Sequence, residues 1–149
     1  MVKKILVPVD GSDTAGKAAR YAADLAKQTG AAITLLSVID TSPYTTRSVP
    51  AVATPTHLIE PIEDYLRQTA GAFLSEAKKI CKGRKVKSKS VVRSGHPMEE
   101  ILKEAKASGV DLIVVGSHGR SALGATLLGS VAFGIIHRDT SLPVLVVRR

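Results

Sequence analysis

Two glycine pairs in the carboxyl-terminal part of the sequence are the residues best suited to bind an anion. The chain reads Gly116-Ser117-His118-Gly119, then nine residues, then Gly129-Ser130. Glycines let backbone N–H groups approach a ligand closely, and a helix N-terminus offers unpaired donors and the positive end of the helix dipole. An apolar run, Asp111 to Val115, precedes the first pair, and an apolar helical stretch follows the second. The spacing predicts a phosphate-binding loop, although it is not a P-loop, because no lysine follows the second pair.

Strand-like and helix-like stretches alternate along the whole chain. Parallel strands with right-handed helical connections are favoured by such an order, so we predict an α/β domain with an open five-stranded parallel sheet and helices on both faces. The predicted strands are residues 5–9, 32–39, 86–93, 110–115 and 143–147, and the predicted helices are residues 13–28, 62–80, 98–105 and a stretch after 129. Residues 41–61, rich in Thr, Ser and Pro, predict a long surface loop. Tyr65 and Phe73 are predicted to lie in the core.

Length and composition predict a single domain over residues 1–149. Hydrophobic residues make up 44% and charged residues 23% of the chain, which is typical of a globular protein. No apolar run is long enough to span a membrane, and the first residues lack the features of a signal peptide. A single cysteine, Cys81, excludes an internal disulfide. We therefore expect a cytoplasmic protein with no membrane partner and a buried, inert thiol.

The basic residues are concentrated in one segment. The net charge is +8, and eight of the 21 basic residues lie between Lys78 and Arg93, with no acidic residue among them. No aromatic residue lies near them, so the stacking platform of single-strand nucleic-acid binders is missing. Lys85, Lys87 and Lys89 alternate as they do on an edge strand that resists aberrant pairing. We predict a solvated edge of the sheet and no specific nucleic-acid partner.

Three chemically useful positions fall where predicted strands end. Asp10 follows the first strand, Val38 closes the second and Gly116 closes the fourth. Ligands of open α/β sheets bind beyond these carboxyl ends, where the strand order reverses. Asp10 is suited either to accept hydrogen bonds from ribose hydroxyls or to cap the first helix. Ser130 is likewise suited to bond a phosphate oxygen, to cap the last helix, or to do both.

Together these residues resemble the universal stress protein family, and specifically its ATP-binding branch. The resemblance covers essentially the whole chain, from the opening residues 5–12 and residues 37–40 to the closing residues 143–147. It includes Gly95-His96-Pro97 before the third predicted helix. The decisive match is the pattern Gly-x-x-Gly-x9-Gly-Ser at residues 116–130, from which the sequence does not depart.

The resemblance implies a fold, a ligand and an assembly. The fold is Rossmann-like, of the adenine nucleotide alpha hydrolase type, with strand order 3-2-1-4-5. The ligand is ATP, with Pro8 and Asp10 at the ribose and the backbone of Val38 at adenine. The loop residues that would wrap the sugar and the phosphates are Gly116, Ser117, His118, Gly119, Arg120 and Ser121, and those that would hold the phosphates are Gly129, Ser130 and Val131. The assembly is a homodimer that pairs through the last strand, Leu142 to Val147.

We therefore expect an ATP-binding universal stress protein whose nucleotide state regulates its contacts. His57, His96 and His137 lie at no metal-ligand spacing, so Mg²⁺ would be carried by the phosphates of ATP rather than by a protein site. The sequence shows no general base, nucleophile or Walker-type lysine, so we assign no catalytic residue and expect at most slow hydrolysis. Two alternatives stay open: an ATPase or phosphotransferase on the same site, and a nucleotide-independent interaction protein that uses its basic face.

Overall fold

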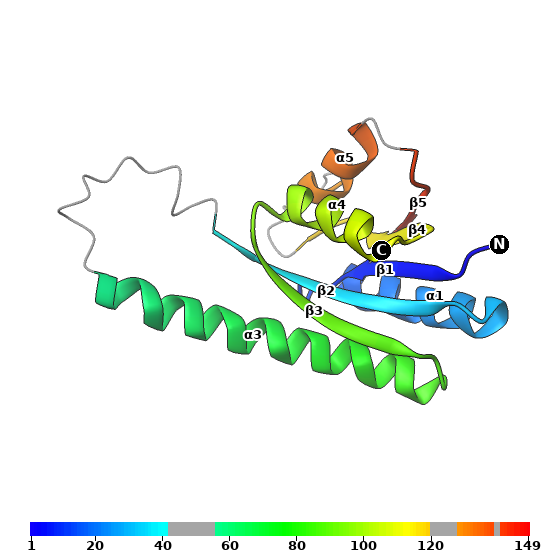
Figure 1. The fold of residues 1–149 in the computed structure, drawn as a ribbon, viewed down its shortest axis with the longest axis horizontal. Helices are drawn as coiled ribbons and strands as arrows, with labels where there is room; N and C mark the ends of the chain where they lie inside the picture. Colours follow the sequence, from blue (N-terminus) through cyan, green and yellow to red (C-terminus); the bar gives the residue numbers. More distant parts are fainter. Residues whose placement is uncertain (42–55, 120–127, 139–140) are drawn as a thin grey trace.

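Strands and helices alternate in the computed structural model, which describes residues 1–41, 56–119, 128–138 and 141–149 (Figure 1). Most element ends lie within a residue or two of the sequence predictions, and Gly30 and Gly109, with φ of 77° and 61°, terminate two helices as expected. The elements are β1 (Lys4–Pro8), α1 (Asp13–Thr29), β2 (Ala32–Asp40), α3 (Thr56–Gly83), β3 (Ser88–Gly95), α4 (Pro97–Ser108), β4 (Leu112–Gly116), α5 (Ser130–His137) and β5 (Val144–Val147).

The strands form one parallel sheet in the order β3-β2-β1-β4-β5, which confirms the predicted fold class and strand order. The chain moves outward from β1 to β3 and then returns to place β4 on the other side of β1. The order therefore reverses between β1 and β4, whose carboxyl ends bound a crevice. The lysine-bearing β3 is an edge strand, as its sequence predicts, and β5 is the opposite edge.

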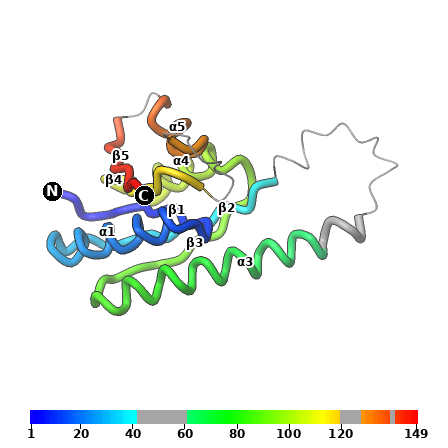
Figure 2. The backbone as a smooth tube through the Cα atoms, turned by 180° about the vertical axis from the view of Figure 1, so that it is seen from behind, coloured from blue at the N-terminus to red at the C-terminus, as the bar shows by residue number. Residues whose placement is uncertain are grey.

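Helices cover both faces of the sheet. Helices α1 and α3 lie on one face, and α4 and α5 lie on the other (Figures 1 and 2). Because side chains alternate along a strand, Ile5 and Val7 join the core under α1 and α3, whereas Leu6 joins the core under α4 and α5. Cys81 lies in the first of these cores with no exposed surface, and burial raises the pKa of its thiol. No helix in the described part of the chain is long and apolar enough to cross a membrane.

Helix α3 differs from the prediction at its amino-terminal end. The sequence predicts a loop through residue 61, but the helix already begins at Thr56 and contains Pro61. Because Pro61 lies close to the start of the helix, it removes only one backbone hydrogen bond. The helix-forming tendency of the residues around it outweighs this loss. The rest of the predicted loop, residues 42–55, lies outside the described residues.

The prediction of a core position for Tyr65 is also wrong. Its side chain is 67% exposed, because the amino-terminal part of α3 extends beyond the sheet and beyond the other elements that the structure describes (Figure 1). Helical periodicity alone does not show where a helix leaves the core. Phe73, one turn past Ala70, is half-buried against the α1 side of the core.

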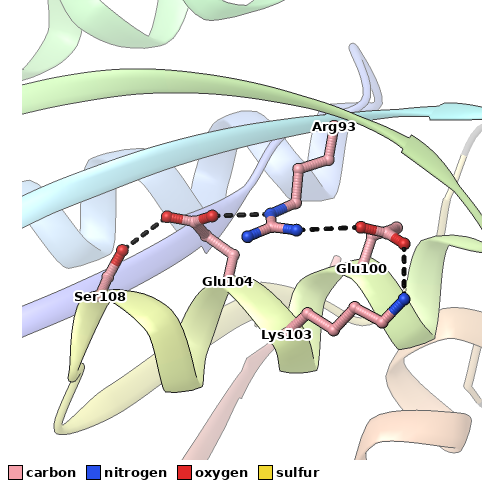
Figure 3. Close-up of polar contacts among 5 residues, drawn as sticks. All are labelled: Arg93, Glu100, Lys103, Glu104 and Ser108. Carbon is pink, nitrogen blue, oxygen red and sulfur yellow. Dashed lines mark hydrogen bonds and ion pairs between the residues drawn. The ribbon is translucent and has the colours of Figure 1, made fainter.

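An ion-pair network joins edge strand β3 to α4 (Figure 3). Arg93 donates from Nε to Glu104 at 2.7 Å and from Nη1 to Glu100 at 3.2 Å, while Ser108 Oγ donates to the other oxygen of Glu104. Both glutamates are largely buried. Burial acts to raise the pKa of Glu104, but the hydrogen bonds from Ser108 and Arg93 outweigh it and hold this pKa below its usual range. The hydrogen bonds with Glu104 and Glu100 raise the pKa of Arg93.

We predict that this network stabilises the fold only above acidic pH. A carboxylate whose pKa is lowered by folding contributes stability above its unfolded pKa, about 4.3, and loses it as the pH falls through the folded value. Glu104→Gln should lower the free energy of unfolding by about 1–2 kcal/mol at pH 7. The difference from wild type should shrink toward pH 3 in urea titrations.

The matched control is Glu76→Gln, which removes an exposed pair with Lys79 and should change the stability little. If wild type and Glu104→Gln lost stability in parallel on acidification, the role assigned to Glu104 would be wrong.

Candidate functional site

A cleft of about 800 Å³ opens at the carboxyl ends of β1, β2 and β4. It lies at the reversal point of the strand order, where ligands of open α/β sheets bind. Ten of the twelve predicted site residues line it: Pro8, Asp10, Val38, Gly116, Ser117, His118, Gly119, Gly129, Ser130 and Val131. The other two, Arg120 and Ser121, lie outside the described residues. Residues 116–119 form the first limb of the cleft wall, and residues 129–131 form the second limb.

Gly116 is a glycine because α1 approaches β4 closely at this point. A Cβ on Gly116 would lie 2.6 Å from Thr14 Oγ1 and 2.7 Å from the carbonyl carbon of Thr14. The backbone of α1 would have to move to admit any side chain here. Gly116 therefore has a packing role that the sequence did not reveal, in addition to its place in the cleft wall.

Hydrogen bonds to β5 and α1 fix the first limb. The Ser117 N–H donates to the Val147 carbonyl at 2.8 Å, which ties this limb to the last residue of β5. The Thr14 hydroxyl donates to the His118 carbonyl and accepts the His118 N–H at 3.3 Å. A hydrogen bond of 2.7 Å joins Ser117 Oγ to His118 Nδ1. Strand β5 and helix α1 thus hold the limb from two sides.

The two limbs contact each other directly. The Gly129 N–H donates to the Ser117 carbonyl at 2.6 Å. A Cβ on Gly129 would lie 3.1 Å from both this oxygen and His118 Cα, so the contact leaves little room for a side chain. The Gly129 N–H is therefore engaged within the protein, and the donors that the second limb presents are those of the next residues.

These donors belong to the first turn of α5. Gly129 is its N-cap, and the first intrahelical bond runs from the Phe133 N–H to the Gly129 carbonyl. The N–H groups of Ser130 and Val131 precede that bond and lie at the positive end of the helix dipole. Ser130 is exposed, so its hydroxyl is accessible as well.

Three helices begin at the cleft, and their first turns differ in charge. Helix α1 has Asp13 in its first turn and α4 has Glu99 and Glu100, whereas α5 has no acidic residue there. Carboxylates compensate the dipole of the first two helices and repel a bound anion. The first turn of α5 is the one electrostatically suited to phosphate.

Asp10 supports the turn into α1 but does not cap the helix, which is the role of Ser12. Asp10 Oδ1 accepts the Ser12 N–H at 2.9 Å, which shapes the turn into α1, and Ser12 itself caps that helix by accepting the Ala15 N–H. Its Oδ2 lies 3.0 Å from where a Cβ on Gly119 would be. One carboxylate oxygen therefore serves the turn while the other faces the first limb.

Val38 contributes to the cleft through its backbone. Just past the end of β1, the Val9 N–H donates to the Leu36 carbonyl of β2 at 2.8 Å. Backbone groups of a strand alternate between its two neighbours, so those of Val38 face the same side as those of Leu36, beyond the end of β1. A planar ring with hydrogen-bond donors and acceptors on its edge is suited to bond these backbone groups of Val38.

Part of the cleft wall was not predicted from the sequence. Helix α3 contributes Leu66, Thr69, Ala70 and Phe73, and the start of α4 contributes His96, Pro97 and Met98. Phe73 also packs against the turn after β1, since a Cβ on Gly11 would lie 2.3 Å from its ring. The sequence motif Gly95-His96-Pro97 indicated the part of the cleft wall that α4 contributes. Its spacing along the chain, however, did not predict that it lies beside Val38.

The basic segment between Lys78 and Arg93 is partly neutralised. Arg84 pairs with Asp24, Lys79 pairs with Glu76, and Arg93 pairs with two glutamates of α4. These ion pairs reduce the net positive charge that the segment would present to an acidic partner. Among the described residues, no group of three or more His, Cys, Asp or Glu side chains is placed to hold a metal ion.

Comparison with known proteins gives one consistent family. The model of the universal stress protein family matches residues 1–148. Universal stress protein YxiE of Bacillus subtilis is 38% identical over 149 residues, which cover 99% of this chain and all of the relative.

Solved structures share the fold along the whole chain. The structure of protein MJ0577, a universal stress protein of Methanocaldococcus jannaschii, superposes with a TM-score of 0.85 at 34% identity and covers 100% of this chain and 97% of that one. A universal stress protein solved in complex with cAMP has a TM-score of 0.68 at 24% identity, covering 99% and 97% of the two chains.

Proposed function

Because this chain belongs to the universal stress protein family, we propose that it binds ATP in the cleft at the carboxyl ends of β1, β2 and β4. The observation that carries the proposal is the first turn of α5, which presents N–H donors without a carboxylate beside them. The same fold holds an adenine nucleotide in the cAMP complex of a universal stress protein. A triphosphate suits this cleft because the second limb and the dipole of α5 favour concentrated negative charge.

Each part of the nucleotide has a distinct set of partners in this proposal. The backbone of Val38 binds adenine, while Pro8 and Asp10 Oδ2 lie at the ribose. The first limb and Ser130 and Val131 bind the phosphates, with Arg120 and Ser121 added from the family resemblance. Mg²⁺ arrives with the triphosphate and keeps most of its ligands from phosphate and water.

The bound nucleotide serves regulation rather than turnover. Asp10 Oδ1 bonds the turn into α1 and its Oδ2 lies at the ribose in this proposal, while His118 Nδ1 is bonded to Ser117, so we assign neither of these described residues to the activation of water. Hydrolysis, where it occurs, is therefore slow. We place this nucleotide-dependent role in the stress response, in the cytoplasm, where ATP is plentiful.

We also propose a homodimer that pairs through β5. The Pro143 carbonyl accepts the Ile113 N–H and the Val147 carbonyl accepts the Ser117 N–H, so alternate residues of β5 bond β4. The backbone groups of Val144 and Val146 face the other way, toward the free edge. A two-fold mate would satisfy them, and such an interface closes on itself.

The ATP site is tested by placing a charge at the phosphate end. Ser130→Asp adds a carboxylate to the first turn of α5, where it stabilises the helix but repels phosphate. We expect calorimetry to show ATP affinity at least about tenfold weaker than wild type, which corresponds to about 1.4 kcal/mol. Adenosine affinity should be unchanged, because adenosine carries no phosphate.

Ser130→Asn is the matched control, since it has nearly the shape of Asp without the charge. It should bind ATP nearly as well as wild type. Equal ATP affinities for the Asp and Asn variants would show that the phosphates lie elsewhere.

The dimer is tested at the outward backbone of β5. Val146→Pro removes an N–H that faces the free edge while leaving the bonds to β4 in place, and edge strands accept proline. We expect light scattering across a dilution series to show monomers for this variant and dimers for wild type. Val146→Ala removes a similar part of the side chain but keeps the N–H, and it should remain dimeric.

Two results would contradict the dimer. A wild-type protein that is monomeric at high micromolar concentration would exclude the assembly itself. A Val146→Pro variant that dimerises as tightly as Val146→Ala would exclude pairing through this edge.

A further inference from the structure

We propose that Thr14 positions the first limb for phosphate binding, an inference that rests on the ATP site proposed above. Thr14 lies in the first turn of α1, 104 residues before His118 in the chain. Its hydroxyl reaches the cleft wall only because Gly116 has no side chain and lets α1 approach. Sequence patterns give this threonine no role, since its neighbours supply the helix cap and the ribose carboxylate.

The contact with His118 is two-sided. Thr14 Oγ1 donates to the His118 carbonyl and accepts the His118 N–H at 3.3 Å. A single side-chain oxygen therefore bonds both backbone groups of His118. That residue lies between Ser117, which is bonded to β5 and to the second limb, and Gly119, which faces Asp10.

Helix capping does not account for Thr14. Ser12 is the N-cap of α1, and its hydroxyl accepts the Ala15 N–H. Thr14 is only 3% exposed, so its hydroxyl is not hydrogen-bonded to bulk solvent. A buried hydroxyl needs a partner, and the one that Thr14 has is the backbone of the first limb.

Loss of the Thr14 hydroxyl should weaken the binding of the phosphates more than the binding of the nucleoside. Without the hydroxyl, the His118 backbone loses its two bonds to α1, and the first limb keeps its bonds to β5 and to the second limb but is less firmly ordered before the ligand binds. Completing that order on binding costs free energy. Adenosine contacts Asp10 and the Val38 backbone in the proposed site, and neither is bonded to Thr14. ATP affinity should therefore depend on Thr14 more strongly than adenosine affinity does.

The experiment compares Thr14→Ser with Thr14→Ala, which differ only in the hydroxyl, and adds Thr14→Val, which keeps the shape of threonine. Calorimetry measures the affinity of each protein for ATP and for adenosine. Hydrogen exchange by NMR measures the His118 amide in the absence of ligand. Comparing the Ser and Ala variants keeps the test valid even if the Val variant does not fold.

We expect ATP affinity to fall about tenfold in the Ala and Val variants, the size expected for one buried hydrogen bond, and to stay near wild type in the Ser variant. Adenosine affinity should stay near wild type in all three. The His118 amide should exchange faster in the Ala and Val variants than in the Ser variant.

Three outcomes would overturn the inference. Equal ATP affinities for the Ser and Ala variants would show that the hydroxyl has no role in phosphate binding. Equal losses of ATP and adenosine affinity would reduce Thr14 to a general stabilising residue. A wild-type protein that binds no ATP would overturn the proposed function together with the inference, and this result is recognised before any variant is measured.

Discussion

The close approach of α1 to the end of β4 is the constraint on which the site depends. Gly116 allows it, because a single Cβ there would collide with the backbone of Thr14. The approach brings the start of α1 beside the first limb and closes one side of the crevice between β1 and β4. In parallel α/β sheets the carboxyl ends are where such crevices form, but their width is set by local packing of this kind.

The residues of the glycine motif divide their work between structure and ligand. Gly116 admits α1, and Gly129 admits the first limb and bonds the Ser117 carbonyl. Ser130 and Val131 then present the donors that remain. The glycine motif thus forms rigid contacts within the protein and also presents a short row of N–H groups at the cleft. Such a preformed arrangement is suited to bind a ligand with little conformational change of the protein.

The framework also connects the cleft with the proposed dimer strand. Ser117 bonds the carbonyl of Val147 at the end of β5, so the first limb and the sheet edge share a hydrogen bond. On the opposite side, Arg93 and its two glutamates hold α4 to β3 next to Val38. The cleft is therefore supported from both edges of the sheet.

Most of the fold was predictable from the sequence because its signals are local. Apolar runs gave the strands, and glycines such as Gly30 and Gly109 gave the helix ends. The start of α3 and the exposure of Tyr65 were not predictable, since a helix that extends beyond its sheet keeps the same periodicity as one that is covered.

That the site residues meet at one cleft was predictable from the sequence, but the contacts among them were not. Asp10, Val38 and the glycine motif are found around one cleft, as their places at strand ends predicted. The contact of Thr14 with His118 joins residues 104 positions apart, and the α3 wall depends on how two layers meet. No pattern within a window of sequence carries such information.

The central claim is that the donors at the start of α5 receive the phosphates of ATP. The most direct measurement is the change in backbone amide chemical shifts when the protein is titrated with ATP and, separately, with adenosine. The account predicts that the Ser130 and Val131 amides shift with ATP only, while amides near Val38 shift with both ligands. ATP-dependent shifts confined to the Lys78–Arg93 segment, with the start of α5 unchanged, would contradict it.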